Sequence, residues 1–182
     1  MYQLTSVSSI EDIPEEIRDT PIGLLLEYHN LNRPFDVYSQ ALLLIGMCMD
    51  NRKRLKIPDN FAYIIRSGGA NMQDSEFYVS FAIAVGGVTA IALIGHTNCG
   101  MVNLKSKQDE FVVGLEERGG WDQSTAEEHF LQNATKVEIK NEVNFVLSEA
   151  NRLRLSYPGV EVVPMIYQVE DNLLHLIRKE EG

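Results

Sequence analysis

Three short apolar runs near the middle of the chain most constrain how it can fold. They are ALLLIGMC at residues 41–48, FAYIIR at 61–66 and VTAIALIG at 88–95, and polar or glycine-containing segments separate them. Continuous apolar runs of this length, rich in Ile and Leu, are typical of strands that are buried on both faces. Such strands occur in parallel sheets that carry helices on both sides.

A helix is predicted between the second and third runs. In DSEFYVSFAIAVGG, the apolar residues Phe77, Phe81 and Val85 recur at helical spacing. Asp74 or Ser75 can cap the start of this helix, and the Gly-Gly pair can end it. Because the order is strand, helix, strand, the connection is expected to be a right-handed parallel crossover.

The second half of the chain predicts one more helix and one more strand. Within residues 125–155 the apolar stripe of a long helix falls at steps of 4, 3, 4 and 3, on Ile139, Val143, Val146, Ala150 and Leu153. The stretch VEVVPMIYQVED at 160–171 then predicts the last strand. Its Pro164 removes a ladder hydrogen bond, so we expect this strand at an edge of the sheet.

These elements predict an α/β fold with a mostly parallel central sheet, of about four parallel strands plus an edge strand, flanked by helices. With 182 residues, of which 45% are hydrophobic, the chain can bury one core, so one main domain is expected. Residues 1–34 are polar and acidic and predict an N-terminal helical arm, with short helices around 10–18 and 22–30. Residues 35–182 are predicted to form the single α/β domain. A polar insert at 105–124 can cover a pocket or lie at a subunit interface, and its composition does not distinguish between these two positions.

Charge and hydropathy exclude several classes of partner. The chain has 16 Lys and Arg against 26 Asp and Glu, a formal net charge of −10, which repels nucleic acid and anionic membranes. Its start has no basic segment followed by an apolar one, and no stretch approaches the roughly 18 apolar residues of a membrane span. We therefore expect a soluble, cytoplasmic protein with no nucleic-acid or membrane partner.

Both cysteines of the chain fall at the ends of predicted strands. Cys48 closes the first apolar run, while His96 and Cys99 stand in GHTNCGM, directly after the third. Ligands bind beyond the carboxyl ends of the strands in open parallel sheets, so these three side chains are expected to meet there. Two thiolates and an imidazole are ligands that zinc prefers, and three protein ligands leave one position open, as in catalytic zinc sites. The alternative is that both cysteines are small buried hydrophobic residues.

Asp50 and Arg52 follow Cys48 in the segment CMDNR. The Asp50 carboxylate can fill the fourth zinc position, or it can accept a hydrogen bond from zinc-bound water. Arg52 offers it a competing partner, because a guanidinium holds a carboxylate through two parallel hydrogen bonds. Taken alone, the pair is more typical of an ordinary loop ion pair, and only its position beside the metal ligands favours a catalytic role.

The two motifs together, Cys48-x-Asp50-x-Arg52 and His96-x-x-Cys99, each at the end of an apolar strand, resemble the β-class carbonic anhydrases. The resemblance extends over residues 38–104, the long helix and the last strand. After the second strand this family carries an Arg-Asn-Ala-Gly-like loop beside the metal, and here residues 66–71 read RSGGAN. By this resemblance Ser67, Gly68 and Gly69 line the substrate pocket. The residue between the aspartate and the arginine is Asn51, where the family usually has serine.

The resemblance implies a zinc-dependent carbonic anhydrase, a lyase with one Zn²⁺ per chain held by Cys48, His96 and Cys99. Zinc-bound hydroxide would hydrate carbon dioxide reversibly to bicarbonate, with Asp50 and Arg52 as catalytic residues. The resemblance also implies self-association as a dimer or tetramer in which the N-terminal arm packs on a neighbouring subunit.

Two alternatives remain open at this point. Relatives of this fold hydrolyse carbon disulfide or carbonyl sulfide, and nothing in the sequence separates these substrates from carbon dioxide. The rearranged loop at 66–71 also keeps open a non-catalytic, zinc-stabilised binding protein in which Asp50 stays on the metal.

Overall fold

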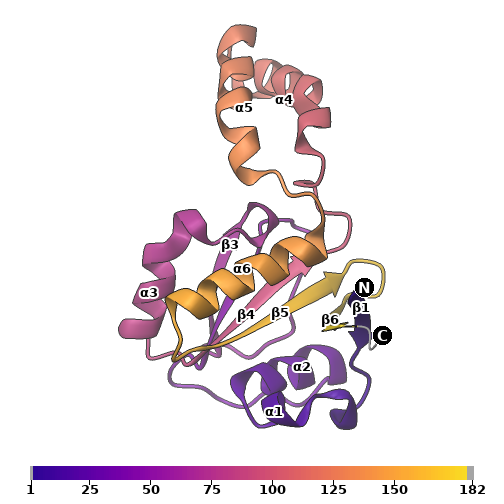
Figure 1. The fold of residues 1–182 in the computed structure, drawn as a ribbon, viewed down its shortest axis with the longest axis vertical. Coiled ribbons are helices and arrows are strands. Elements are labelled where there is room, and N and C mark those ends of the chain that lie inside the picture. The colour runs from indigo at the N-terminus through magenta and orange to yellow at the C-terminus, as the bar shows by residue number, and fades with distance from the viewer. Residues whose placement is uncertain (1, 180–182) are drawn as a thin grey trace.

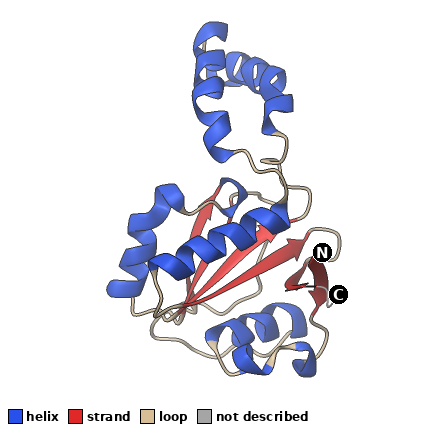
Figure 2. Cartoon of the chain, viewed as in Figure 1, coloured by secondary structure: helices blue, strands red, loops and turns tan. Residues whose placement is uncertain are grey.

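The structure, a computed structural model, describes residues 2–179 and contains a six-stranded sheet between helices (Figure 2). The strand order is β1-β6-β5-β4-β2-β3. Strands β3, β2, β4 and β5 are parallel, and β6 and β1 add two antiparallel strands. The strands span Tyr2–Ser6 (β1), Leu43–Cys48 (β2), Ala62–Ser67 (β3), Ala90–His96 (β4), Glu161–Gln168 (β5) and Leu173–Lys179 (β6). The predicted α/β class and its four parallel strands are confirmed.

Helices cover both faces of this sheet, and two further helices project from it (Figure 1). Helices α1 and α2 lie on one face, and α3 and α6 lie on the other. The helices span Glu15–Arg18 (α1), Pro21–Leu31 (α2), Glu76–Ala84 (α3), Gln108–Gly114 (α4), Gln123–Val137 (α5) and Glu142–Ser156 (α6). None of the helices in the described part of the chain has the length and hydropathy that a membrane crossing requires.

The central strands are buried on both faces, as the apolar runs predicted. Successive side chains of a strand point to opposite faces. Leu43, Ile45 and Met47 of β2 pack in the cluster that includes helix α2, whereas Leu44 packs in the cluster that includes α3 and α6. Every residue of β2 and β4 is buried. This double burial holds the carboxyl ends of the two strands in place.

The prediction that residues 160–171 form an edge strand is wrong. Strand β5 lies between β4 and β6. Pro164 is paired with Leu93 in the parallel ladder, but the antiparallel ladder with β6 starts only at Met165. Since proline has no N–H to donate, it ends the ladder to β6 without excluding β5 from the interior of the sheet.

The predicted long helix over 125–155 is two helices, α5 and α6. The chain leaves the helical conformation at Glu138, and the Asn141 side chain caps the start of α6 by accepting a hydrogen bond from the Asn144 N–H at 2.9 Å. Ile139 lies between the helices, where its N–H donates to the Met101 carbonyl at 3.0 Å. The apolar residues therefore keep their helical spacing across the break between the two helices. Ile139, however, is buried beside the strand ends and not under α6.

Helix α3 forms where it was predicted, but its apolar stripe faces outwards. Val79 and Ala82 are its buried residues. The exposed apolar residues of α3 and its C-terminal cap, together with two on the neighbouring edge strand, form what we call the β3–α3 face: Tyr63, Ile64, Phe77, Tyr78, Phe81 and Val85. Exposed apolar groups gathered in this way are typical of interaction surfaces.

The N-terminal segment is integrated into the sheet and its cover. Residues 2–6 form β1, which was not predicted, and pair with β6 from Tyr2 opposite Lys179 to Ser6 opposite His175. Helix α2 buries Ile22, Leu25 and Leu26 in the same cluster as β2 and β4. The helical part of the arm thus packs on its own chain, and its predicted packing on a neighbouring subunit stays a prediction.

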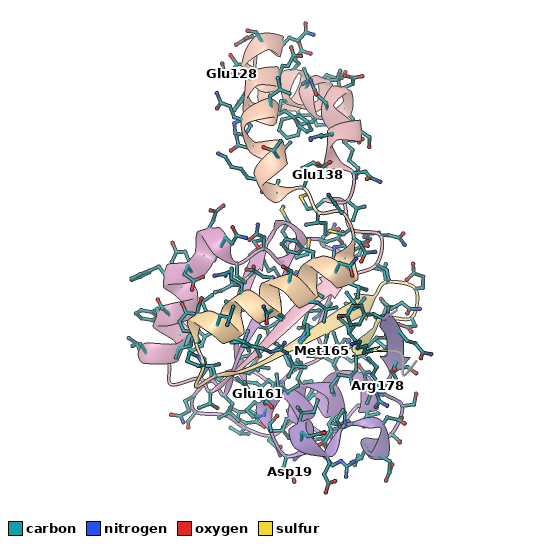
Figure 3. The ribbon with its side chains drawn as sticks, in the orientation of Figure 1. Asp19, Glu128, Glu138, Glu161, Met165 and Arg178 are labelled. Atoms are coloured by element: carbon teal, nitrogen blue, oxygen red, sulfur yellow. The ribbon has the colours of Figure 1, made fainter. Side chains whose placement is uncertain are left out.

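Residues 104–137 form a helical hairpin that stands out from the sheet (Figure 3). Glu128 lies towards its outer end and Glu138 at its base. Phe111 of α4 and Phe130 of α5 pack against each other with ring centroids 5.1 Å apart. The predicted polar insert at 105–124 is therefore the first arm of this hairpin, which begins directly after the segment that carries Cys99.

A buried histidine joins helix α2 to two loops. His29 is 1% exposed, its Nδ1 accepts the Lys56 N–H at 3.1 Å, and its Nε2 donates to the Asn172 carbonyl at 3.1 Å. Because Nδ1 is an acceptor in this arrangement, the ring is neutral. Burial lowers the pKa of His29 to about 4.

Folding stability is expected to fall in acid because of His29. Its pKa is lower in the folded chain than in the unfolded one, so its contribution is complete above about pH 6.5 and is lost as the pH falls towards 4. Between pH 7 and pH 4 this loss is about 3 kcal/mol. Urea unfolding of the metal-free protein should show that His29→Gln lacks this part of the pH dependence. The exposed His129→Gln serves as control, and equal pH dependence of all three proteins would contradict the assignment.

Candidate metal centre

Two parallel strands bring the three predicted ligands together. Strands β2 and β4 are neighbours, with Met47 paired to Ile94, so their carboxyl ends lie side by side. Cys48 is the last residue of β2 and His96 the last residue of β4, and Cys99 follows in the next turn. All three side chains are buried. The predicted meeting of these residues at one edge of the sheet is observed.

The three donor atoms have the spacing of a metal site. Sγ of Cys48 lies 4.0 Å from Sγ of Cys99, and all three ligand atoms lie within 4.8 Å of one another. Two metal–sulfur bonds of about 2.3 Å at a tetrahedral angle place the sulfurs about 3.8 Å apart. A disulfide needs about 2.05 Å, and both cysteines are free. The geometry therefore fits a tetrahedral metal ion.

The histidine is oriented for a metal. Its Nδ1 lies 2.9 Å from the Thr97 carbonyl oxygen, which only accepts hydrogen bonds, so Nδ1 carries the proton. Nε2 then carries no proton and has a free lone pair. Among residues 2–179 this buried atom has no hydrogen-bond partner. Metal-binding histidines are commonly held in this way, with the outer nitrogen donating to a carbonyl. A metal ion would satisfy the unpartnered nitrogen of His96.

The surroundings stabilise negative charge on Cys48. The Gly69 N–H donates to Sγ of Cys48 at 3.3 Å. A hydrogen bond from the Cys99 thiol lowers the pKa of Cys48 well below its usual value, and the same contact raises the pKa of Cys99. One proton shared between the two sulfurs thus describes the metal-free pair, and a metal ion would displace it.

The predicted pocket loop contacts the candidate metal ligands mainly through one backbone group, the Gly69 N–H. Gly69 has a φ of +64°, and a Cβ there would lie 3.3 Å from the Ile139 side chain, so glycine fits this position best. Gly68 lies against Met101. The Ser67 hydroxyl instead donates to the Asn71 carbonyl at 2.5 Å within its own loop. Of the three predicted pocket residues, Gly69 is therefore the one that is seen to donate a hydrogen bond to a ligand atom.

Asp50 is held by Arg52 beside the ligand atoms. Nε and Nη2 of Arg52 donate to the two carboxylate oxygens at 3.0 and 2.7 Å, and Nη2 also donates to the Asn98 carbonyl at 2.8 Å. These bonds hold the pKa of Asp50 well below its usual range, so the carboxylate is ionised. Oδ2 of Asp50 lies 3.9 Å from Nε2 of His96. The carboxylate therefore lies next to the candidate metal position while bound to the guanidinium.

Lys53 is a residue of this centre that sequence reasoning missed. Its side chain is fully buried, and its ammonium lies 4.0 Å from Oδ1 of Asp50. Burial lowers its pKa, while the charged forms of Cys48 and Asp50 raise it. In the run RKRLK, residues 52, 54 and 56 are exposed and 53 is buried. In an extended segment, alternate side chains point to opposite sides, so one lysine of this run could have been expected to point inwards. A basic run is more often a solvated loop, and for that reason Lys53 was missed.

Two of the cavities near the centre differ in character. One of about 760 Å³ is lined by Arg52, Arg54 and Lys56 together with Phe35 and Leu55. The other, of about 200 Å³, lies between the two arms of the helical hairpin and is lined largely by apolar residues: Met101, Leu104, Phe111, Phe130, Ala134 and Val137. Met101 also packs against the buried cluster of Cys48, Cys99 and Ile139.

Comparison with solved structures identifies the fold. β-carbonic anhydrase isoform I from Trichomonas vaginalis matches with a TM-score of 0.62 and 16% identity, over 89% of this chain and 96% of that one. A carbonic anhydrase from Glaciozyma antarctica matches with a TM-score of 0.58 and 18% identity, over 89% and 98%. The chain has the β-carbonic anhydrase fold.

The fold is also similar to that of a protein named for a different reaction. The apo form of a carbon disulfide hydrolase matches with a TM-score of 0.55 and 18% identity, over 93% of this chain and 98% of that one. No family model matches the chain, and no curated protein is significantly similar to it in sequence. The β-carbonic anhydrase fold is thus established at the level of structure.

Removal of one thiolate is expected to abolish metal binding. Cys99→Ser keeps the size of the side chain but replaces a soft thiolate with a hydroxyl that stays protonated at neutral pH. Elemental analysis should find about one metal ion per wild-type chain and less than about a tenth of that in the variant. Asn98→Ser, an exposed neighbour, should keep the metal. Full metal content in Cys99→Ser would contradict the assignment of Cys99 as a ligand.

Proposed function

We propose that this chain is a zinc-dependent carbonic anhydrase that reversibly hydrates carbon dioxide to bicarbonate. The observation that carries the proposal is the position of Asp50, whose Oδ2 lies 3.9 Å from the metal-facing nitrogen of His96 while its carboxylate is bound to Arg52. Three buried ligands with a fourth position left open are typical of catalytic zinc. Sites in which the metal only stabilises the fold are closed by four protein ligands.

The residues around the centre support hydration chemistry. Zinc at this site would lower the pKa of a water molecule at its open position towards 7 and so supply a nucleophile near neutral pH. Asp50 is ionised and therefore only accepts hydrogen bonds, which orients a neighbouring water with a lone pair free for the substrate. Arg52 keeps the carboxylate in that place through two parallel hydrogen bonds.

The charge of the centre supports an anionic product. Two thiolates neutralise a zinc ion, so the remaining side-chain charges decide the sign. Arg52 and Lys53 lie beside Asp50, and Arg66 donates to the Cys48 carbonyl at 3.3 Å. Three basic side chains therefore lie near the centre, together with the carboxylates of Asp50 and of Glu142, which accepts the Cys99 N–H at 3.1 Å, in a chain whose net charge is −10. An anion such as bicarbonate would be stabilised by Arg52 and Lys53, and Arg52 also lines a cavity in which Arg54 and Lys56 accompany one carboxylate, Asp171.

A second candidate keeps the centre and changes the substrate. The apolar cavity behind Met101 suits a small apolar molecule, and a carbon disulfide hydrolase shares the fold. Carbon disulfide or carbonyl sulfide is therefore the alternative substrate for the same residues. Assays with carbon dioxide and carbon disulfide on one preparation of known zinc content would distinguish the two.

Asp50→Asn is expected to lower hydration without loss of metal. The amide keeps the shape of the side chain but loses the charge that binds Arg52 and accepts from water. Removal of a positioned acceptor of this kind typically costs 10²–10⁴-fold in rate, so we expect kcat/KM for carbon dioxide to fall at least about 100-fold. Stopped-flow hydration between about pH 6.5 and 9, on protein of measured zinc content, tests this.

The exposed Asp59→Asn serves as control and should leave the rate unchanged. Wild-type protein with stoichiometric zinc and no hydration of carbon dioxide at any pH would contradict the proposal. Hydrolysis of carbon disulfide by that protein would then support the second candidate, and turnover of neither substrate would support a binding protein.

The same proposal includes self-association, which the β3–α3 face supports. Strand β3 is terminal in the described sheet, so one of its edges has no strand beside it. Tyr63 and Ile64 of this strand are 42% and 46% exposed, and Phe81 of the adjoining helix is 48% exposed. An apolar strand edge can pair antiparallel with a second copy of itself about a two-fold axis, which buries the face on both subunits.

A charge placed on this face is expected to dissociate the oligomer. Ile64→Lys combined with Phe81→Glu puts two charged groups on each side of the proposed contact, where burial would be costly. Sedimentation velocity should show a dimer or tetramer for the wild type and at least a tenfold weaker association for the variant. Val37→Glu, at a fully exposed position outside this face, should have no effect. An unchanged oligomer in the double variant would contradict the assignment.

A further inference from the structure

Two buried polar atoms of the centre lack hydrogen-bond partners within residues 2–179. One of them needs a positive group beside it, and the other needs a negative group. Nε2 of His96 has a free lone pair, which a metal ion satisfies. Nζ of Lys53 has three donors and no lone pair when charged, so a metal ion cannot satisfy it. A fully buried ammonium without a partner is costly and is retained where negative charge lies near it.

Asp50 is the carboxylate that approaches Lys53. Nζ lies 4.0 Å from Oδ1 of Asp50, while the other oxygen, Oδ2, lies 3.9 Å from Nε2 of His96. The thiolates of Cys48 and Cys99 also favour the charged lysine, and Arg66 opposes it. The carboxylate therefore has a cation on one side and a metal-ligating nitrogen on the other.

Arg52 holds this carboxylate from a partly exposed position. Its side chain is 44% exposed, and exposed ion pairs are weakened by water and salt. Lys53 is 0% exposed, so its attraction for Asp50 acts through the protein interior and is screened much less. The buried lysine thus adds to the Arg52 hydrogen bonds an attraction for Asp50 that water and salt weaken little.

We propose that Lys53 is a positioning residue that keeps Asp50 away from the metal and so keeps the fourth coordination position open. This inference rests on the proposed function only in requiring a metal ion on Cys48, His96 and Cys99. The carboxylate has two competing places, the metal and the pair of cations. Arg52 holds the carboxylate beside the cations through hydrogen bonds. Lys53 adds the attraction of a buried positive charge, which solvent screens little.

The test reads metal coordination and not turnover. Cobalt(II) in place of zinc gives a visible spectrum that changes when an added anion enters the fourth position. The wild-type protein, Lys53→Met, Asp50→Asn and the double variant are each loaded with cobalt and titrated with azide. We expect Lys53→Met to weaken azide binding by roughly tenfold or more, because Asp50 then occupies the fourth position.

The double variant separates positioning from direct attraction of the anion. In the absence of the Asp50 carboxylate, Lys53→Met should change azide binding by less than about twofold, since no competing ligand remains. An equal loss with and without that carboxylate would show that Lys53 attracts the anion itself and would overturn the proposal. Unchanged azide binding in Lys53→Met would overturn it as well.

Lys53→Arg and Lys53→Gln complete the set. Arginine retains the charge and should keep azide binding near the wild-type value, whereas glutamine should behave as methionine does. If neither Lys53→Met nor Lys53→Gln takes up cobalt, Lys53 is required for folding of the centre and the proposal is wrong. Absence of carbon dioxide hydration would leave these spectra unaffected, so failure of the proposed function is distinguishable.

Discussion

The parallel pairing of β2 with β4 is the constraint on which the candidate centre depends. Their register places Met47 opposite Ile94, so the next residues of the two strands begin the same edge of the sheet. A shift of the register by one residue would turn each side chain to the other face. Both strands are buried on both faces, and such a shift would also exchange the residues of the two core clusters. The packing of the core therefore holds Cys48 and His96 in contact distance of one metal ion.

The electrostatics of the centre oppose those of the rest of the molecule. The chain carries a net charge of −10, yet the basic side chains of Arg52, Lys53 and Arg66 lie around the segment that carries Cys48 and Asp50. Two thiolates make zinc a weaker Lewis acid than imidazoles do, because they donate more charge. Nearby cations and the Gly69 N–H can offset this donation. The basic residues beside the ligands thus support the proposed zinc site.

The sequence predicts those parts of the site that neighbouring residues define. Cys48, His96 and Cys99 follow apolar runs, and Asp50 and Arg52 are two residues apart, so their meeting can be anticipated from strand ends. Features that depend on a distant segment were missed. The polar stretch YQLTS has no strand pattern and becomes β1 only because β6 offers an edge. The break between α5 and α6 lies in phase with the apolar stripe, so periodicity cannot detect it.

The departures from local pattern fall where the proposed activity needs them. Lysine is among the residues least often buried, yet Lys53 has no exposed side-chain surface, and it lies beside Asp50. The apolar stripe of α3 faces outwards at Phe77 and Phe81, next to the sheet edge that is free in the described chain. Each departure weakens the isolated fold, through a buried ammonium without a hydrogen-bond partner in one case and hydrated aromatic surface in the other. Conflicts between local pattern and fold are expected mainly at functional positions, where a ligand or a second subunit removes the cost. These two conflicts therefore support a centre that binds a metal and an anion, in a chain that associates with its own copy.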